Sequence, residues 1–224
     1  MNRILGIIFL GCLLCSCSAA PAPDASPDAL SSATMQRYRE GELREYQGVR
    51  LDPAIGPRDN SIKGIQHVEI AGYKLTVDGL ADQPQSLGYE DVKGLPEQTR
   101  QVTIHCVEGW DAAILWKGVL LEDLMRLAKP QAAVNTVIFH AVDGYTTSLP
   151  LSEIHDKNML LAYGANGLPL PAEMGYPFIV VAEDKWGYKW ARWVNRIELS
   201  SDANYQGYWE KLGYDNQADL PKKD

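Results

Sequence analysis

The sequence predicts a single α+β domain built on a mixed β-sheet. Strand patterns outnumber helical ones, their connections are irregular, and no linker divides the region from residue 45 to 215. This region is long enough to bury a sizeable core. With 46% hydrophobic and 22% charged residues, the composition is typical of a globular protein and excludes disordered and membrane-spanning classes.

The first predicted elements are two strands separated by a helical turn. Tyr73–Val77 alternates as a half-buried strand does, and Asp78-Gly79 ends it with turn residues. Tyr89–Lys93 predicts a short helical turn, which Gly94 closes. The strand predicted at Thr99–Cys106 places a cysteine at its C-terminal end.

The second half of the chain contains a helix and further strands. Val119–Leu127 carries leucines at helical spacing, and Pro130 ends this predicted helix. A loop is expected at Glu183–Lys189, between two strand patterns. The remaining predicted strands are Thr136–Val142, Phe178–Ala182 and Arg192–Leu199.

The N-terminal residues have the pattern of an export signal. A short positive start is followed by the apolar run Ile4–Leu14, which has signal-peptide length. Leu14-Cys15-Ser16-Cys17 resembles the bacterial lipoprotein box, in which Cys17 would carry the lipid. We therefore expect a signal peptide at residues 1–16 and a protein on the periplasmic side of the cell envelope, lipid-anchored to a membrane. The alternative is an ordinary secretory signal cut after Ala19 or Ala20.

The lipidated cysteine is expected to begin a flexible tether at residues 17–44. Pro, Ala and Ser dominate residues 18–33, and such a composition buries too little apolar surface to fold. Residues 216–224 are expected to form a polar tail after the domain. The net charge of −8 and the lack of a basic run exclude nucleic acid as a partner.

The cysteine count isolates one thiol in the mature domain. Cys12 and Cys15 would leave with the signal and Cys17 would be consumed by lipid, so Cys106 has no disulfide partner. Such a thiol is either buried and inert or kept for its chemistry. A thiolate is a soft metal ligand, yet no second cysteine completes a zinc or iron–sulfur set. A cofactor that brings its own sulfur ligands would meet this requirement.

A series of motifs resembles the molybdopterin-binding domain of the sulfite oxidase family. The resemblance covers roughly Glu45 to Tyr214, with the motifs in family order. They are His105-Cys106-Val107-Glu108-Gly109-Trp110, Leu115-Trp116-Lys117-Gly118-Val119, Asp143-Gly144-Tyr145-Thr146-Thr147-Ser148, Asn166-Gly167-Leu168-Pro169-Leu170-Pro171, Asp184-Lys185-Trp186-Gly187-Tyr188-Lys189-Trp190 and Gly207-Tyr208-Trp209-Glu210.

The resemblance implies a sulfite-oxidase-type fold and a role for each matching residue. Cys106 would bind molybdenum alongside the two sulfurs of the pterin, as the catalytic cysteine. Gly187, Tyr188 and Lys189 match a segment that binds the pterin phosphate, and Asn60 matches an asparagine that lines the cofactor cleft. Glycine allows close backbone approach and lysine supplies a point charge for phosphate.

The resemblance implies a molybdopterin-dependent oxidoreductase that transfers an oxygen atom. Asp59 and Asp111 stand where a sulfite site would need basic residues, so a small neutral oxo-compound of the sulfoxide or N-oxide type is the expected substrate. Because no haem-attachment motif is present, electrons are expected to pass through a separate partner, a cytochrome or a membrane subunit.

Two alternatives compete with this reading. The signal carries only Arg3, whereas enzymes of this class are generally exported folded through a twin-arginine signal, so the domain could be a cofactor-free, membrane-tethered binding module. A copper or zinc site built from Cys106, His105 and His140 is the second alternative. The histidines otherwise show no metal-ligand spacing and are expected to be structural. The residues Trp110, Trp116, Trp190 and Trp193 are expected in the core.

Overall fold

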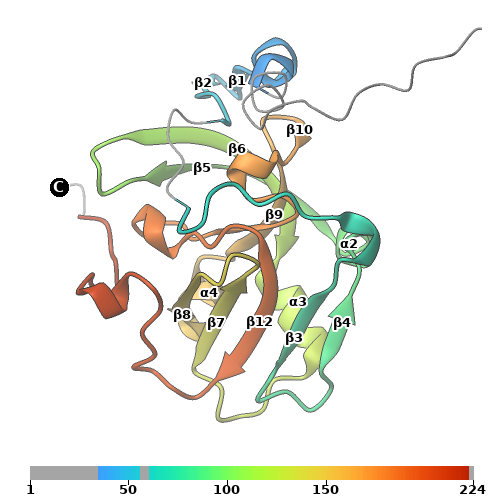
Figure 1. Cartoon of the computed structure of the whole chain (residues 1–224), viewed down its shortest axis with the longest axis vertical. Helices are drawn as coiled ribbons and strands as arrows, with labels where there is room; N and C mark the ends of the chain where they lie inside the picture. The colour runs from blue at the N-terminus through green and yellow to red at the C-terminus, as the bar shows by residue number, and fades with distance from the viewer. Residues whose placement is uncertain (1–34, 56–60, 222–224) are drawn as a thin grey trace, which may run out of the picture.

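The fold consists of two five-stranded sheets packed around a common core (Figure 1). The computed structural model describes residues 35–55 and 61–221. The predicted lipidation site Cys17 and the predicted cleft residue Asn60, together with Asp59, lie outside the described residues.

The first sheet is mixed, as the sequence predicts. Its strand order is β4-β3-β12-β7-β8, and β12 pairs in parallel with β3 but antiparallel with β7. The strands are β3 (Leu75–Gly79), β4 (Gln85–Leu87), β7 (Thr136–Ala141), β8 (Thr146–Pro150) and β12 (Val194–Ser200).

The second sheet is antiparallel and contains the strand that ends before Cys106. Its order is β10-β9-β6-β5, and β11 also pairs with β9. The strands are β5 (Glu97–His105), β6 (Asp111–Leu120), β9 (Leu160–Ala165), β10 (Leu168–Pro169) and β11 (Ile179–Val181). β5 and β6 form a long hairpin whose turn spans residues 106–110.

Short helices connect the strands, and a small hairpin lies near the N-terminal end. Residues 35–41 are helical, and β1 (Glu45–Tyr46) pairs with β2 (Val49–Arg50). The α-helices are α2 (Tyr89–Lys93), α3 (Leu121–Ala128) and α4 (Leu151–Asp156). The 3₁₀ turns are η1 (Ile70–Gly72), η2 (Ala172–Met174), η3 (Gly187–Lys189) and η4 (Glu210–Leu212).

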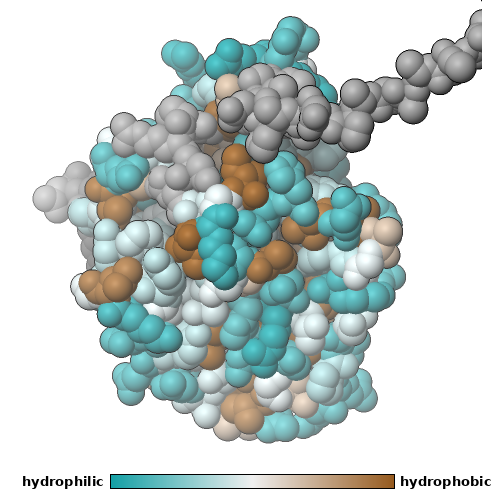
Figure 2. Space-filling model, viewed as in Figure 1, coloured by the Kyte–Doolittle hydropathy of each residue, from teal (hydrophilic) through white to brown (hydrophobic). Residues whose placement is uncertain are grey.

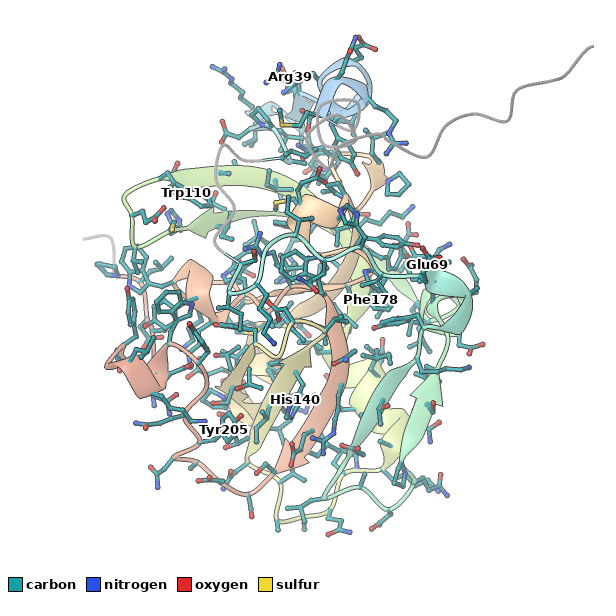
Figure 3. All side chains as sticks on the ribbon, viewed as in Figure 1. Arg39, Glu69, Trp110, His140, Phe178 and Tyr205 are labelled. Carbon is teal, nitrogen blue, oxygen red and sulfur yellow. The ribbon has the colours of Figure 1, made fainter. Side chains whose placement is uncertain are left out.

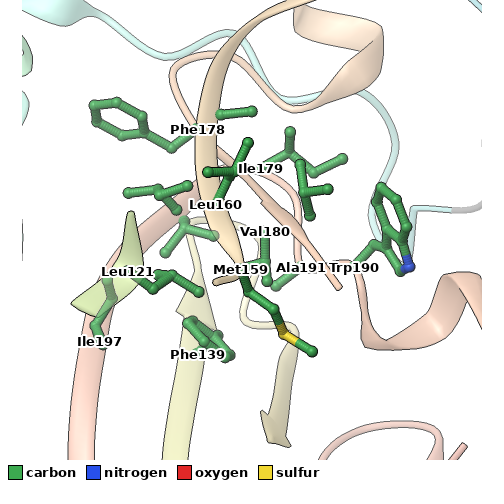
Figure 4. Close-up of a cluster of buried hydrophobic side chains, with 14 of the residues drawn as sticks. Leu121, Phe139, Met159, Leu160, Phe178, Ile179, Val180, Trp190, Ala191 and Ile197 are labelled. Atoms are coloured by element: carbon green, nitrogen blue, oxygen red, sulfur yellow. The ribbon is translucent and has the colours of Figure 1, made fainter. Parts of the chain in front are cut away.

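The core lies where the two sheets and α3 meet. Phe139 and Ile197 come from the mixed sheet, Leu160 and Val180 from the antiparallel sheet, and Leu121 from α3 (Figure 4). All five side chains are buried. Burying such side chains contributes roughly 1.5–3 kcal/mol each before the entropic cost of folding is counted, so this cluster holds the two sheets together.

The predicted fold class and most predicted elements are confirmed, but strand β6 is missed. The predicted helix at Val119 begins instead at Leu121, because residues 111–120 pair with β5 on one side and β9 on the other. Gly118 obscures this strand in the sequence, and its role is steric. A Cβ atom there would overlap the carbonyl oxygen of Leu161 at a register shift between β6 and β9.

The folded region extends beyond the predicted domain limits of 45 and 215. Tyr38 lies in the segment expected to be a tether, yet its ring is buried in the core. Ala218 lies in the segment expected to be a polar tail, and it is buried against the main fold. Both ends therefore contribute to packing.

The surface combines polar and apolar residues. Figure 2 shows hydrophilic and hydrophobic residues interspersed over the viewed face. Across residues 35–55 and 61–221, no helix has the length and apolar character needed to cross a bilayer.

Tyrosine burial predicts a loss of stability at alkaline pH. Burial raises the pKa of Tyr89 and Tyr188 from 10.0 to about 12. Tyrosines of the unfolded chain ionise near pH 10, so above this pH the unfolded state releases protons that the folded state retains. The free energy of unfolding should therefore fall as the pH rises from 10 to 12. Urea titrations at a series of pH values measure it; simultaneous ionisation of all tyrosines near pH 10 in the folded protein would contradict it.

Candidate active site

The hairpin turn between β5 and β6 holds Cys106 in one position. The Cys106 amide donates to the carbonyl of Trp110 at 2.8 Å, and the Gly109 amide donates to the carbonyl of Cys106 at 3.0 Å. Gly109 adopts a φ of 86°, a left-handed conformation that glycine reaches without a steric penalty. The cysteine is only 7% exposed. The predicted strand end is therefore confirmed, with the thiol at a closely bonded turn.

Cys106 lines a cavity of about 520 Å³. This volume lies within the range of small-molecule and cofactor sites. Segments far apart in the sequence contribute to the walls, from Met35 to Tyr214. Figure 3 shows Trp110, another lining residue, at the turn end of the β5–β6 hairpin. The cavity thus joins the hairpin turn to distant parts of the sequence.

The loop over residues 184–190, which we call the Gly187 loop, lies against the end of β5. Trp186 forms a parallel bridge with His105. A Cβ atom on Gly187 would lie 3.2 Å from the carbonyl oxygen of His105, tighter than most such contacts. Gly187 and Tyr188 both line the cavity beside Cys106. The structure therefore brings three of the predicted site residues together.

Lys189, the fourth predicted site residue in the described chain, lies outside the cavity wall. Its side chain is buried, and its ammonium donates to Glu210 Oε1 at 2.5 Å and to Asn216 Oδ1 and the Ser148 carbonyl, each at 3.1 Å. Burial lowers the pKa of Lys189, while the bond to Glu210 opposes that shift. The point charge expected for a phosphate is thus directed at protein acceptors.

The positive charge on the described cavity wall comes from Arg192. Its Nη1 donates to the Glu173 carbonyl at 2.9 Å, and its guanidinium lies 4.8 Å from the ring centroid of Trp193. Arg192 was not predicted as a site residue, because it lies two residues beyond the end of the motif Asp184–Trp190. A cation near a glycine-containing loop was the signal that could have identified it.

Acidic residues outnumber the arginine on the described wall. Glu108, Asp143 and Glu173 line the cavity. Asp111, which the sequence analysis placed beside the substrate, instead has a side chain that is 66% exposed, with its carboxylate 3.7 Å from His105 Nδ1. Acidic residues therefore line the cavity, but Asp111 is not among its described lining residues, and Asp59 lies outside the described residues.

Aromatic side chains form much of the cavity wall, but not every tryptophan of the motifs takes part. Trp116 lies in the core, as expected, and its indole N–H donates to the Val102 carbonyl. Trp190 is buried too, but it also lines the cavity. The rings that sequence reasoning did not assign to the site include Tyr145, Trp209 and Tyr214. Two of these stand within matched motifs, which was the available signal for them.

The histidines do not complete a metal site with Cys106. His140 Nε2 lies 2.8 Å from Glu198 on the mixed sheet, away from the hairpin turn that carries Trp110 (Figure 3). Within the described part of the chain, no group of three or more His, Cys, Asp or Glu side chains could hold a metal ion. The copper or zinc alternative therefore has no support among these residues.

The family follows from a comparison with known domains. Residues 62–209, more than half of the chain, match the model of the oxidoreductase molybdopterin binding domain. The chain belongs to this family. The resemblance to sulfite oxidases is confirmed, and the protein is an oxidoreductase with a molybdopterin-binding domain.

Two curated relatives support this assignment. The chain is 37% identical over 152 residues to YuiH of Bacillus subtilis, described as an uncharacterized oxidoreductase, covering 67% of this chain and 76% of YuiH. It is 28% identical over 143 residues to MsrP of Ralstonia nicotianae, a protein-methionine-sulfoxide reductase catalytic subunit. That match covers 57% of this chain and 43% of MsrP, less than half of the relative's length.

A solved structure has the same fold. The sulfane dehydrogenase SoxCD from Paracoccus pantotrophus matches with a TM-score of 0.61 at 20% identity, covering 83% of this chain and 56% of that chain. At this identity the likeness concerns the fold alone. It confirms the sulfite-oxidase-type α+β architecture.

Proposed function

We propose that this protein transfers an oxygen atom on a small neutral oxo-compound, using one molybdenum–molybdopterin with the Cys106 thiolate as protein ligand to the metal. The observation that carries the proposal is the position of Cys106, at a fixed strand end, beside a glycine loop and on the wall of a cavity of about 520 Å³.

The residues present fit such a cofactor. Cys106 is the one cysteine in residues 35–55 and 61–221, so its soft thiolate suits a metal whose other sulfur ligands belong to the pterin. Gly187 leaves room where a Cβ atom would approach the end of β5. The Arg192 guanidinium supplies positive charge on the wall for an anionic group.

The bound group would supply the redox chemistry, and the chain would hold and shield it. The β5–β6 turn orients the thiol through the amides of Cys106 and Gly109. The Tyr145 hydroxyl donates to the Tyr188 carbonyl, and the Tyr188 hydroxyl donates to the Asp215 carbonyl at 2.8 Å. Both hydroxyls carry their protons at neutral pH, and burial moves the pKa of each tyrosine further above its ordinary value. The aromatic side chains that line the cavity would shield the bound group from water.

The wall favours a neutral substrate over sulfite. Glu108, Asp143 and Glu173 line the same cavity as one arginine, so once that arginine serves an anionic group of the cofactor, a second anion such as sulfite would meet a surplus of negative charge. Aromatic rings make favourable contacts with sulfur, which suits a sulfoxide and its thioether product. MsrP, a methionine-sulfoxide reductase by name, supports this class of substrate.

The location and the electron partner complete the proposal. The box Leu14-Cys15-Ser16-Cys17 supports a lipid anchor at Cys17, on the periplasmic side of the envelope. A separate cytochrome or membrane subunit would exchange electrons with the site. The name of MsrP, a catalytic subunit, supports such a division of labour.

Replacing Cys106 with serine should abolish activity and molybdenum retention. A poorly ionised hydroxyl replaces a soft thiolate of nearly equal volume, so the free energy of unfolding should change by less than about 1 kcal/mol. Molybdenum analysis of protein purified from its native envelope measures retention. Thr103→Ala is the matched control, because this side chain lies on the opposite face of β5. A folded wild-type protein without molybdenum or pterin would favour the cofactor-free binding module instead.

A substrate panel should favour sulfoxides over sulfite. The loaded protein is assayed with sulfite, methyl sulfoxides and N-oxides at matched concentrations and at two ionic strengths. We expect the neutral compounds to turn over and sulfite to react poorly, improving as salt screens the acidic wall. Efficient sulfite turnover at low salt would contradict the proposed substrate class.

Replacing Cys17 with alanine should release the protein from membranes. Without the acylated cysteine the proposed lipid anchor is lost, so the variant should appear in the soluble envelope fraction. Cys15→Ala is the matched control, since that residue precedes the expected cleavage site. Retention of the Cys17→Ala protein in the membrane pellet after a salt wash would rule out this anchor.

A further inference from the structure

The C-terminal segment over residues 207–220, which we call the strap, is bonded along the Gly187 loop. It follows β12 and runs up one side of the molecule (red in Figure 1). The Trp186 amide donates to the Ala218 carbonyl at 2.9 Å, and the Leu220 amide donates to the Asp184 carbonyl at 3.0 Å. The strap thus accompanies the loop that lies beside Cys106.

A buried ion pair joins the strap to the loop. The side chains of Lys189 and Glu210 are both 0% exposed, and the Lys189 ammonium lies 2.5 Å from Glu210 Oε1. Thr147 donates to the same carboxylate oxygen at 2.7 Å. With Asn216 and the Ser148 carbonyl as further acceptors, all three donors of the ammonium are satisfied. No donor capacity remains for a phosphate.

A second buried lysine, four residues earlier in the loop, has a similar set of partners. Lys185 is 2% exposed and contacts Glu153 at 2.5 Å and Asp219 at 2.6 Å. It also donates to the Gln217 carbonyl at 2.9 Å. Both lysines of the loop are therefore directed away from the cavity and into the strap.

The strap also supplies part of the cavity wall. Trp209 and Tyr214 line the cavity; Trp209 directly precedes Glu210, and Tyr214 directly precedes Asp215, whose carbonyl accepts from the Tyr188 hydroxyl. The ring of Tyr214 lies 5.2 Å from that of Tyr188 on the loop and 5.1 Å from that of Trp209. Any movement of the strap relative to the loop would therefore change the walls on both sides of this aromatic contact.

We propose that Lys189 and Glu210 are a positioning pair, which fastens the strap to the Gly187 loop and so fixes the aromatic wall of the cavity, rather than a contact to the cofactor. Breaking a buried pair leaves an uncompensated charge, whereas replacing both partners with apolar residues of similar volume is often neutral. This asymmetry separates the proposed role from a phosphate contact.

The test is a double-mutant cycle on the full chain purified from its native envelope. Lys189→Met and Glu210→Met are made singly and together. Each single variant should raise the unfolding equilibrium constant roughly a hundredfold or more and increase amide exchange in the loop and the strap, and the double variant should recover at least about tenfold. Lys157→Met is the matched control. That exposed lysine pairs with Asp184 on the same loop, so its loss should cost less than about fivefold.

The pterin content and the metal spectrum separate positioning from overall stability. This part of the test rests on the proposed function, whereas unfolding and amide exchange do not. Both single variants should lose pterin, and their remaining molybdenum, poised as Mo(V), should give a broadened electron paramagnetic resonance spectrum. The double variant should recover the pterin content and the narrow spectrum. If the double variant stays as poor in pterin as Lys189→Met while Glu210→Met keeps its pterin, Lys189 contacts the cofactor and the proposal fails.

If the methionine variants do not fold, a second set of variants replaces the ion pair with a neutral hydrogen-bonded pair. Lys189→Gln with Glu210→Gln is then compared with each glutamine variant alone. Recovery in this double variant supports the positioning pair, and equal losses in all three variants overturn it. A wild-type protein that contains no pterin would overturn the proposed function, but the unfolding and exchange measurements would still decide whether Lys189 and Glu210 are a positioning pair.

Discussion

The close approach of the Gly187 loop to the end of β5 is the constraint on which the site depends. Cys106 follows β5 directly, so the position of its thiol is set by the strand and by the turn that closes it. The Trp186–His105 bridge brings a loop from eighty residues further along the chain against that end. A side chain at Gly187 would press on the His105 carbonyl. This backbone contact therefore places Gly187 and Tyr188 on the cavity wall beside Cys106.

The Gly187 loop needs further contacts to hold this position, because a loop is seldom rigid by itself. The strap gives that support through two buried lysines and several backbone bonds. Burying a lysine is costly, and the cost is offset only where acceptors surround the ammonium. Lys185 and Lys189 each have three acceptors. Although the chain has a net charge of −8, it buries two lysines, and each one joins the Gly187 loop to other segments of the fold.

Local patterns predicted much of the fold, and long-range pairing accounts for what they missed. The helix Tyr89–Lys93 was predictable as a short turn that Gly94 closes. The strands around Thr136 and Ile197 were predictable because their apolar residues are the ones that become buried. β6 was not, because its charged and glycine positions interrupt the alternation, and two neighbouring strands determine its conformation. The burial of Tyr38 and Ala218 likewise depends on distant partners, which composition does not reveal.

The candidate site shows the same division between local and distant information. Cys106, Gly187 and Tyr188 were identified from motifs, and they meet at the cavity. Lysine beside a glycine loop resembles a phosphate contact in sequence, but the direction of a side chain depends on what lies beyond it. Glu210, twenty-one residues later, turns Lys189 inward. Arg192, three residues after Lys189, then remains on the wall as the cation that an anionic group would meet. Charge near a motif therefore indicates a site, but only the buried partners determine which charge faces it.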